Sequence, residues 1–311
     1  MDRVLMTGGT GFIGKYVVKE LLDRGIEVTC ITSNREHEKD DNISRSSNIS
    51  RKNTCKYIFS SYNYFVLEER LKGEKFDTFI HLGWGGVDSI EKNDIDLQLE
   101  NIKISVDMIR LSKKVGCRLF IGAGTVAEYV YNENVIDLSK KQTPNDVYGA
   151  TKVACHYILE ATAKQIGQDL IWAVLPSTYG EGRKGDNILT YTIKSLLSNK
   201  KPKYGKLEQM WDFLYVSEVA RALVELGEKG KHNSTYGIGS GVYRTLKDYI
   251  VIVRNLINPD LELGIGELDV PEELSSCVDI AKLTNDTGFV PQISFEEGIR
   301  RTIEYYKNLI I

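Results

Sequence analysis

Close to its start the chain carries the stretch TGGTGFIG, residues 7–14, which decides the fold. Before it, residues 3–6 form a short apolar run that is typical of a buried strand. After it, residues 12–24 repeat apolar side chains at helical spacing, and Gly25 follows as a suitable helix end. The stretch therefore predicts a tight turn from a strand into a helix.

The glycines of this turn, Gly8, Gly11 and Gly14, have the spacing G-x-x-G-x-x-G. Gly8 allows the turn, Gly11 allows a diphosphate to approach the backbone, and Gly14 allows the helix to pack close to the strand. The helix then directs unpaired N–H groups and its positive dipole end toward the phosphates. This arrangement predicts a dinucleotide site.

Strand and helix patterns alternate through the first half of the chain. The predicted strands are residues 26–31, 76–82, 118–123 and 170–175, and the predicted helices are about 94–114 and 146–165. Such repeats predict a parallel sheet with helices on both faces. Residues 36–54 contain almost no apolar side chain, so we expect a surface loop there.

The alternation ends after Pro176, where turn-rich segments separate shorter periodic runs. Residues 246–257 predict a helix, and Ser294 with Glu297 predicts a capping box at the start of the last one. We therefore expect an α/β protein, with a doubly wound parallel sheet of the Rossmann type and a smaller C-terminal α/β substrate lobe. The expected domains are 1–175 plus about 211–243 for the cofactor, and about 176–210 plus 244–311 for the substrate.

Composition excludes several classes of protein. The 311 residues carry a net charge of −3, which gives no basic surface for nucleic acid. No apolar run is long enough to span a membrane, and residues 1–6 lack the pattern of a signal peptide. The five cysteines are scattered, without zinc spacing or a disulfide framework. We expect a cytoplasmic protein with no membrane or nucleic-acid partner.

Tyr148 and Lys152 lie four residues apart and so share one face of a predicted helix. A free tyrosine has a pKa near 10, and a nearby ammonium group stabilises the phenolate. Thr125 ends the strand before this helix, where its hydroxyl either faces a cofactor or bonds nearby backbone. His81 ends another buried strand, and we interpret it as a packing residue because no second histidine is spaced to share a metal.

The end of the second strand decides between NAD and NADP. An NAD site usually has Asp or Glu there, whereas an arginine nearby favours the 2′-phosphate of NADP. Here residues 30–35 include Ser33 and Arg35 and no acidic residue. We therefore expect NADP, with NAD as the alternative.

The chain resembles the extended short-chain dehydrogenase/reductase family, in its NAD(P)-dependent sugar epimerase/dehydratase branch. The motifs that carry the resemblance span the whole chain: TGGTGFIG at 7–14, HLGWGG at 81–86, Asn101, GAGTVAEY at 122–129, YGATK at 148–152, STYGEG at 177–182, WDFLYVSEVARAL at 211–223 and DIAKLTNDTGFVP at 279–291. The resemblance implies a nucleotide-sugar substrate. It also implies a homodimer formed by a four-helix interface from residues 94–115 and 146–165, although both apolar stripes could instead face the sheet.

The resemblance also implies site residues. Thr125, Tyr148 and Lys152 would be catalytic, with Tyr148 as the acid/base and Lys152 on the nicotinamide ribose. The expected cofactor contacts are Gly8, Thr10, Gly11, Phe12, Ile13, Gly14, Ser33, Arg35, Leu82, Gly83, Trp84, Lys152 and Ser177. The expected substrate contacts are Trp84, Thr125, Tyr148, Asn187 and Gln209, and no metal is expected.

Departures from the family pattern narrow the reaction. Family dehydratases have an Asp-Glu pair directly after the catalytic threonine, where this chain has Val126 and Ala127. Trp211 stands where the family often has an arginine that contacts the diphosphate. We expect NADPH-dependent reduction of a nucleotide-linked 4-keto-6-deoxyhexose, in the synthesis of surface-polysaccharide sugars. The alternatives are an NAD-dependent nucleotide-sugar 4-epimerase and a non-catalytic dinucleotide sensor.

Overall fold

The computed structural model describes residues 1–33, 55–87, 89–130, 135–185, 187–270 and 274–310. Its centre is a seven-stranded parallel sheet in the order β11-β6-β5-β4-β1-β2-β3. The strands are β1 Arg3–Thr7, β2 Glu27–Thr32, β3 Cys55–Phe59, β4 Thr78–His81, β5 Leu119–Thr125, β6 Asp169–Leu175 and β11 Ser234–Gly237. The chain builds outward from β1 to β3 and then crosses to β4. In such sheets the crevice beyond the carboxyl ends of β1 and β4 is where ligands bind.

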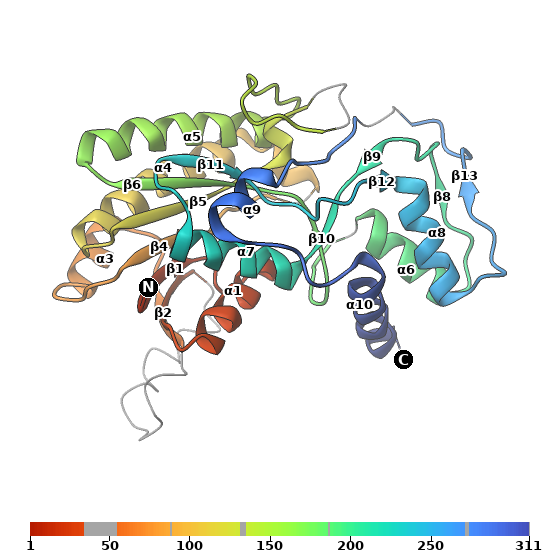
Figure 1. Ribbon diagram of the computed structural model, residues 1–311, viewed down its shortest axis with the longest axis horizontal. Helices are drawn as coiled ribbons and strands as arrows, with labels where there is room; N and C mark the ends of the chain where they lie inside the picture. The colour runs from red at the N-terminus through yellow and green to blue at the C-terminus, as the bar shows by residue number, and fades with distance from the viewer. Residues whose placement is uncertain (34–54, 88, 131–134, 186, 271–273, 311) are drawn as a thin grey trace.

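Helices cover both faces of this sheet (Figure 1). One face packs against α1 Phe12–Asp23, α7 Val216–Lys229 and α9 Ala281–Thr287, and the other against α3 Tyr64–Arg70, α4 Ile95–Lys114 and α5 Val147–Ile166. Successive strand residues alternate between the two cores, so that Met6 lies in the first core and Leu5 in the second. The predicted doubly wound α/β fold is confirmed.

A third core lies beside the sheet, to the right in Figure 1. Its helices are α6 Ile188–Leu197, α8 Leu246–Ile257 and α10 Phe295–Ile310, and its short strands are β7 Ser177–Tyr179, β8 Lys203–Tyr204, β9 Met210–Trp211, β10 Phe213–Tyr215, β12 Arg244–Thr245 and β13 Gly264–Ile265. Phe12 and Ile13, which follow the glycine turn, pack against this core. The turn therefore lies where the two parts of the molecule meet.

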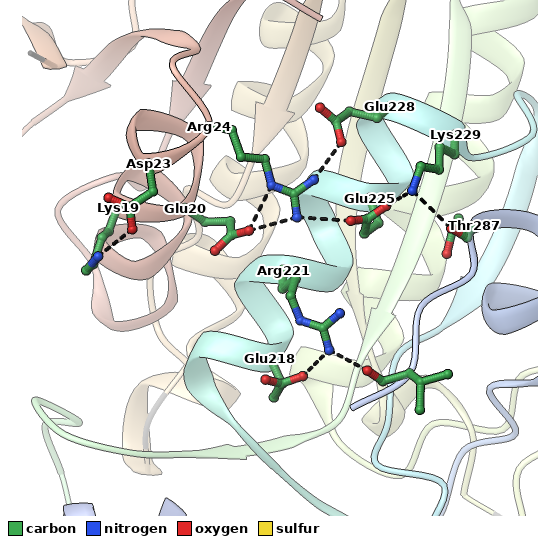
Figure 2. Close-up of polar contacts among 11 residues, drawn as sticks. Lys19, Glu20, Asp23, Arg24, Glu218, Arg221, Glu225, Glu228, Lys229 and Thr287 are labelled. Carbon is green, nitrogen blue, oxygen red and sulfur yellow. Dashed lines mark hydrogen bonds and ion pairs between the residues drawn. The ribbon is translucent and has the colours of Figure 1, made fainter. Parts of the chain in front are cut away.

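An electrostatic cluster joins α1 to α7 (Figure 2). The Arg24 guanidinium lies 2.7 Å from Glu20, 3.0 Å from Glu225 and 2.6 Å from Glu228. Farther along α7, Lys229 donates to Glu225 at 2.7 Å. These contacts fix the C-terminal end of the helix that begins at the glycine turn.

The sequence predicted the first half of the chain well. Each of its predicted strands and helices forms within about two residues of the expected bounds, and residues 246–257 form α8 as predicted. At α10 the Ser294 hydroxyl accepts from the Glu297 N–H at 3.2 Å, while the Glu297 carboxylate bonds Arg301, so half of the capping box is described. The elements without a sequence prediction are β3, β11, α3, α6, α7, α9 and the short strands. The loop expected at 36–54 lies outside the described residues.

The division into two domains remains a proposal, which the three cores support in part. Leu214 and most apolar side chains of residues 219–238 pack with the sheet, as the expected return of 211–243 requires, whereas Tyr215 and Val216 pack in the third core. Leu283 and Phe289 also pack with the sheet, although the expected bounds assign residues 244–311 to the substrate lobe.

Candidate active site at the carboxyl edge of the sheet

The glycine turn leaves no room for side chains at its first and last positions. Gly8 has φ +73°, and a Cβ there would lie 2.7 Å from the carbonyl carbon of Leu82. A Cβ on Gly14 would lie 1.9 Å from the Gly8 carbonyl oxygen. Gly11 has a milder constraint, with the same oxygen 3.2 Å from its Cβ position. Gly8 thus has the positive φ of the predicted tight turn, and Gly14 allows the predicted close packing of the helix.

Helix α1 starts directly at this turn without a side-chain cap on Gly11. Its first N–H groups are therefore oriented toward the turn and available to an anion. Thr10 lies beside the end of β2, where its hydroxyl is 3.4 Å from that of Thr32. Ser33 is exposed and hydrogen-bonds Tyr62, while Arg35 lies outside the described residues.

The end of β4 is fixed by a buried hydrogen-bond chain. Thr7 Oγ1 accepts from the Gly83 N–H at 3.0 Å and lies 2.7 Å from His81 Nδ1, and His81 Nε2 lies 2.9 Å from Ser105 Oγ. The Ser105 hydroxyl donates to the Asn101 carbonyl, so His81 Nε2 carries the proton and Nδ1 accepts from Thr7. Burial lowers the pKa of His81 to about 3, which keeps the ring neutral. Among the described residues no cluster of three or more His, Cys, Asp or Glu side chains could hold a metal.

Two amide side chains of α4 hold the loop that follows β4. Asn101 accepts from the Gly85 N–H at 2.8 Å and donates to the Gly85 carbonyl at 2.9 Å. Gln98 accepts from the Trp84 indole N–H at 2.9 Å and donates to the Gly86 carbonyl at 2.8 Å. The Trp84 ring is therefore held in one orientation above the sheet edge. This loop also includes Leu82 and Gly83, which are predicted cofactor contacts like Trp84.

Trp84, Tyr148 and Lys152 form one cluster. The Lys152 Nζ lies 3.6 Å from the centre of the Trp84 ring and 5.9 Å from the centre of the Tyr148 ring, and it donates to the Ala123 carbonyl at 2.8 Å. The Trp84 and Tyr148 rings meet edge to face at 6.4 Å. Lys92 brings a second ammonium to 5.4 Å from the Tyr148 ring. Burial lowers the pKa of Lys152 to about 8, against the opposing effects of Cys155 and Glu128.

Thr125 ends β5 and caps a short 3₁₀ turn, Val126–Glu128. Its hydroxyl oxygen accepts from the Ala127 N–H at 3.3 Å, which leaves the hydroxyl hydrogen able to donate to another group. The bond to nearby backbone, which we considered as an alternative role, is therefore present. The Glu128 carboxylate accepts from the Thr125 N–H at 2.8 Å and so completes a capping box.

The remaining predicted residues lie beyond the end of β6 or in the C-terminal lobe. Ser177 begins β7, two residues after β6 ends. Asn187 caps α6, because its Oδ1 accepts from the N–H groups of Leu189 and Thr190. Gln209 is half-buried beside β9, and its carbonyl accepts from Leu246. Asn187 and Gln209 share no described contact with the Trp84, Tyr148 and Lys152 cluster.

Sequence reasoning missed three residues that support this cluster: Gln98, Glu128 and Trp172. The pattern Thr125-x-x-Glu128 is itself a capping-box signature, so a sequence signal for Glu128 was present. Gln98 and Trp172 reach the site from distant parts of the chain, and no local spacing indicates them.

Comparison with known proteins identifies the class to which this fold and glycine turn belong. A model of the NAD dependent epimerase/dehydratase family matches residues 4–239. The chain therefore belongs to the NAD dependent epimerase/dehydratase family.

Curated relatives match the chain over nearly its whole length. A dTDP-4-dehydro-6-deoxyglucose reductase of Escherichia coli is 26% identical over 310 residues, 97% of each chain. A dTDP-glucose 4,6-dehydratase of Escherichia coli is also 26% identical over 346 residues, which cover 98% of this chain and 94% of the relative. These relatives are enzymes named for different reactions on dTDP-linked sugars.

Solved structures share the fold. The UDP-N-acetylglucosamine 4-epimerase from Methanobrevibacter ruminantium M1, in complex with UDP-N-acetylmuramic acid, superimposes with a TM-score of 0.83 at 23% identity over 99% of both chains. The UDP-glucuronic acid 4-epimerase from Bacillus cereus, in complex with UDP-glucuronic acid and NAD, gives the same TM-score at 20% identity over 99% of both chains. No described helix of the present chain is long and apolar enough to cross a membrane.

The residues at the sheet edge fit an NAD(P) cofactor. Gly8 and Gly14 form a cradle that any Cβ would fill, and the uncapped start of α1 offers N–H groups to a diphosphate. The buried Lys152 ammonium offers donors beside the Trp84 loop. The arrangement can therefore hold a dinucleotide along this edge of the sheet.

Proposed function

We propose that this protein is an NADPH-dependent reductase acting on C4 of a nucleotide-linked 4-keto-6-deoxyhexose. The grouping of Trp84, Tyr148 and Lys152 beside the glycine turn carries this proposal. The reductase relative of Escherichia coli supports it. The apolar residues Val126 and Ala127 argue against dehydration, because neither can protonate a leaving hydroxyl.

Bound NADPH would supply the hydride that the C4 carbonyl carbon accepts. The Tyr148 hydroxyl then donates its proton to the C4 oxygen as negative charge develops there. The Thr125 hydroxyl donates a hydrogen bond to the same oxygen, since its own oxygen is already an acceptor for Ala127. The Lys152 ammonium stabilises the phenolate that Tyr148 becomes. Lowering a tyrosine pKa by about 3 units requires about 4 kcal/mol, which one close, desolvated charge together with the cofactor can supply.

The test is NADPH consumption with a dTDP-linked 4-keto-6-deoxyhexose. We expect steady-state turnover by the wild type and a loss of at least about 100-fold in Tyr148→Phe. Tyr305→Phe is the control, because Tyr305 lies on α10 beside the third core, outside both this cluster and the α4–α5 surface. Turnover that survives Tyr148→Phe would contradict the proposal and favour a dinucleotide sensor.

The second candidate is a nucleotide-sugar 4-epimerase, which the similarity to solved epimerases favours. Both reactions use the same catalytic residues. An epimerase would copurify with tightly held NAD and would interconvert sugars without net consumption of cofactor. The mass of the copurifying nucleotide separates the two candidates.

We propose NADP rather than NAD as the cofactor. β2 ends at Thr32 and is followed by Ser33, without an acidic side chain to bond the ribose hydroxyls. A fluorescence titration with both reduced cofactors tests this choice, and tighter binding of NADH would contradict it.

We also propose a homodimer formed through α4 and α5. The two helices pack on each other and on the sheet, yet they keep large apolar side chains in solvent. These are Ile95, Leu99, Tyr157 and Ile158, which are 59%, 53%, 55% and 41% exposed. Analytical ultracentrifugation of Leu99→Glu tests this interface, with a monomer as the expected result.

A further inference from the structure

Glu128 is a fully buried carboxyl group that the proposed reaction does not use. It is 0% exposed. Its Oε1 accepts from the Thr125 N–H at 2.8 Å, and both carboxylate oxygens lie 3.2 Å from the Trp172 indole N–H. Burying a carboxylate lowers the stability of a fold unless the charge is paired and hydrogen-bonded, so the partners of Glu128 decide whether it can be ionised here.

The surrounding strands make room for this carboxyl group. A Cβ on Gly124 would lie 2.3 Å from Trp172 Nε1 and 2.6 Å from Glu128 Oε1, and a Cβ on Gly122 would lie 2.7 Å from the Trp172 ring. On its other side the Trp172 ring stacks on His156, with centres 4.6 Å apart and planes 6° apart. The two glycines thus leave space for the Trp172 ring, and stacking on His156 orients its indole N–H toward the Glu128 carboxylate.

The charged group that acts on Glu128 is Lys152. Both side chains bond the end of β5, since Lys152 Nζ donates to the Ala123 carbonyl and Glu128 accepts from the Thr125 N–H two residues further on. The Lys152 ammonium favours the ionised form of Glu128, and the Glu128 carboxylate in turn favours the charged form of Lys152.

Other groups also act on this pair. Cys155 on α5, the Trp172 N–H on β6 and the Thr125 N–H on β5 are among them. Lys152 also contacts the Ala123 carbonyl and the Trp84 ring, and its charge acts on the neutral His81 at the end of β4. Burial nevertheless raises the pKa of Glu128 to about 7, so its charge changes near neutral pH.

We propose that Glu128 is a positioning residue, whose carboxylate fixes Thr125 through its backbone and supplies the counter-charge that keeps the buried Lys152 protonated. Trp172 holds this carboxylate in place. The inference rests on the proposed function of Thr125, Tyr148 and Lys152. It assigns Glu128 no contact with substrate or cofactor.

The test compares Glu128→Gln with the wild-type holoenzyme over pH 5–10. Glutamine can still accept from the Thr125 N–H but carries no charge. We expect kcat to fall about tenfold with KM within about twofold, because Glu128 acts on catalytic groups and touches no substrate. We expect the alkaline limb of the pH profile to move to lower pH by about half a unit or more, because Lys152 loses its counter-charge. An acidic limb near pH 7 should disappear with the carboxylate.

Glu160→Gln is the matched control. Glu160 lies on α5 beyond His156, 3.2 Å from its Nε2, and its side chain is 52% exposed. This variant should keep the wild-type pH profile. A purely structural role for Glu128 would lower stability and leave both pH limbs in place.

Trp172→Phe keeps the carboxylate and removes its indole donor. Because that donor favours the ionised form of Glu128, the acidic limb should move to higher pH. This variant also provides the test if Glu128→Gln does not fold. As a readout without turnover, intrinsic fluorescence of the wild type should show a pH step near 7 that Glu128→Gln lacks.

The outcomes separate this inference from the proposed function. Turnover by Tyr148→Phe would overturn the function itself. If Tyr148→Phe is inactive, the proposed function stands and the role of Glu128 is tested separately. That role would be overturned if Glu128→Gln kept both pH limbs and the fluorescence step of the wild type. It would also be overturned if the acidic limb did not move in Trp172→Phe.

Discussion

The ammonium nitrogen of Lys152 lies 3.6 Å from the centre of the Trp84 indole ring. At this distance the negative face of the ring stabilises the cation. Because Lys152 is only 4% exposed, water contributes little to solvating its charge. The Trp84 ring, the Ala123 carbonyl and the nearby Glu128 charge therefore keep Lys152 protonated.

Substitution of Trp84 should weaken catalysis in steps. Trp84→Phe keeps an aromatic face but loses the bond to Gln98, and we expect kcat/KM to fall about threefold. Trp84→Leu removes the face as well, so a fall of about tenfold and an alkaline limb at lower pH are expected. Steady-state kinetics across pH measures both. A Trp84→Leu enzyme with the wild-type alkaline limb would show that the ring does not stabilise the ammonium.

The last glycine of the turn should be required for cofactor binding. In Gly14→Ala the new methyl group would overlap the Gly8 carbonyl oxygen, so either the turn or α1 must move. We expect the Kd for NADPH, measured by calorimetry, to rise at least about tenfold. Gly25→Ala is the control at the other end of α1. Gly25 has φ +74° with nothing near its Cβ position, so this variant should lose about 1 kcal/mol of stability and keep its affinity. Equal NADPH affinities in the two variants would contradict the prediction.

Removal of Arg24 should lower the stability of the fold, because the carboxylates around it would then repel one another. Arg24→Met leaves Glu20, Glu225 and Glu228 close together without the Arg24 guanidinium, and among the described residues only Glu225 keeps a cation, Lys229 (Figure 2). These side chains are 14–28% exposed, so we expect a loss of about 1–2 kcal/mol in urea unfolding, partly recovered in 1 M salt. Lys19→Met breaks a pair that is 70% and 59% exposed and should cost less than about 0.5 kcal/mol. Similar losses in both variants would contradict this account.

Buried His156 should make the fold sensitive to acid. Burial lowers its pKa to about 4, below the value of about 6.5 for an unfolded histidine. Between these values the unfolded chain binds the additional proton, so stability decreases as the pH falls from about 6.5 to about 4. His156→Phe keeps a ring on Trp172 and removes the proton site. The free energy of unfolding, measured with urea, should then fall less steeply with acid, by up to about 1.4 kcal/mol per pH unit. An unchanged slope would contradict the burial effect.

Local patterns predicted most of the sheet because each strand and its following helix are encoded by adjacent residues. TGGTGFIG marks the first turn, and the spacing of Tyr148 and Lys152 predicts a shared helix face, which the 5.9 Å approach of Nζ to the Tyr148 ring shows. The edge strand β11 was missed because its four residues, Ser234–Gly237, include little apolar sequence. Its place beside β6 depends on pairing with a strand more than 60 residues earlier.

The contacts that support the site were harder to predict, because they too join residues far apart in the sequence. The bond between Glu128 and Trp172 joins residues 44 positions apart, and Gln98 reaches Trp84 from the next helix along the chain. Neither contact follows from the period of a helix or strand. Asn187 shows the opposite case, because an ordinary local role, capping α6, already accounts for its side-chain oxygen.

Gly122 and Gly124 on β5 and Trp172 on β6 constrain one another during evolution. Any larger residue at either position would overlap Trp172, so a single substitution there is blocked while the tryptophan remains. A lineage could enlarge β5 only after first replacing Trp172 with a smaller residue, and it would then lose the indole donor to Glu128. The order of permitted changes is thus constrained at this point, which makes positions 122, 124 and 172 a set that should be redesigned jointly.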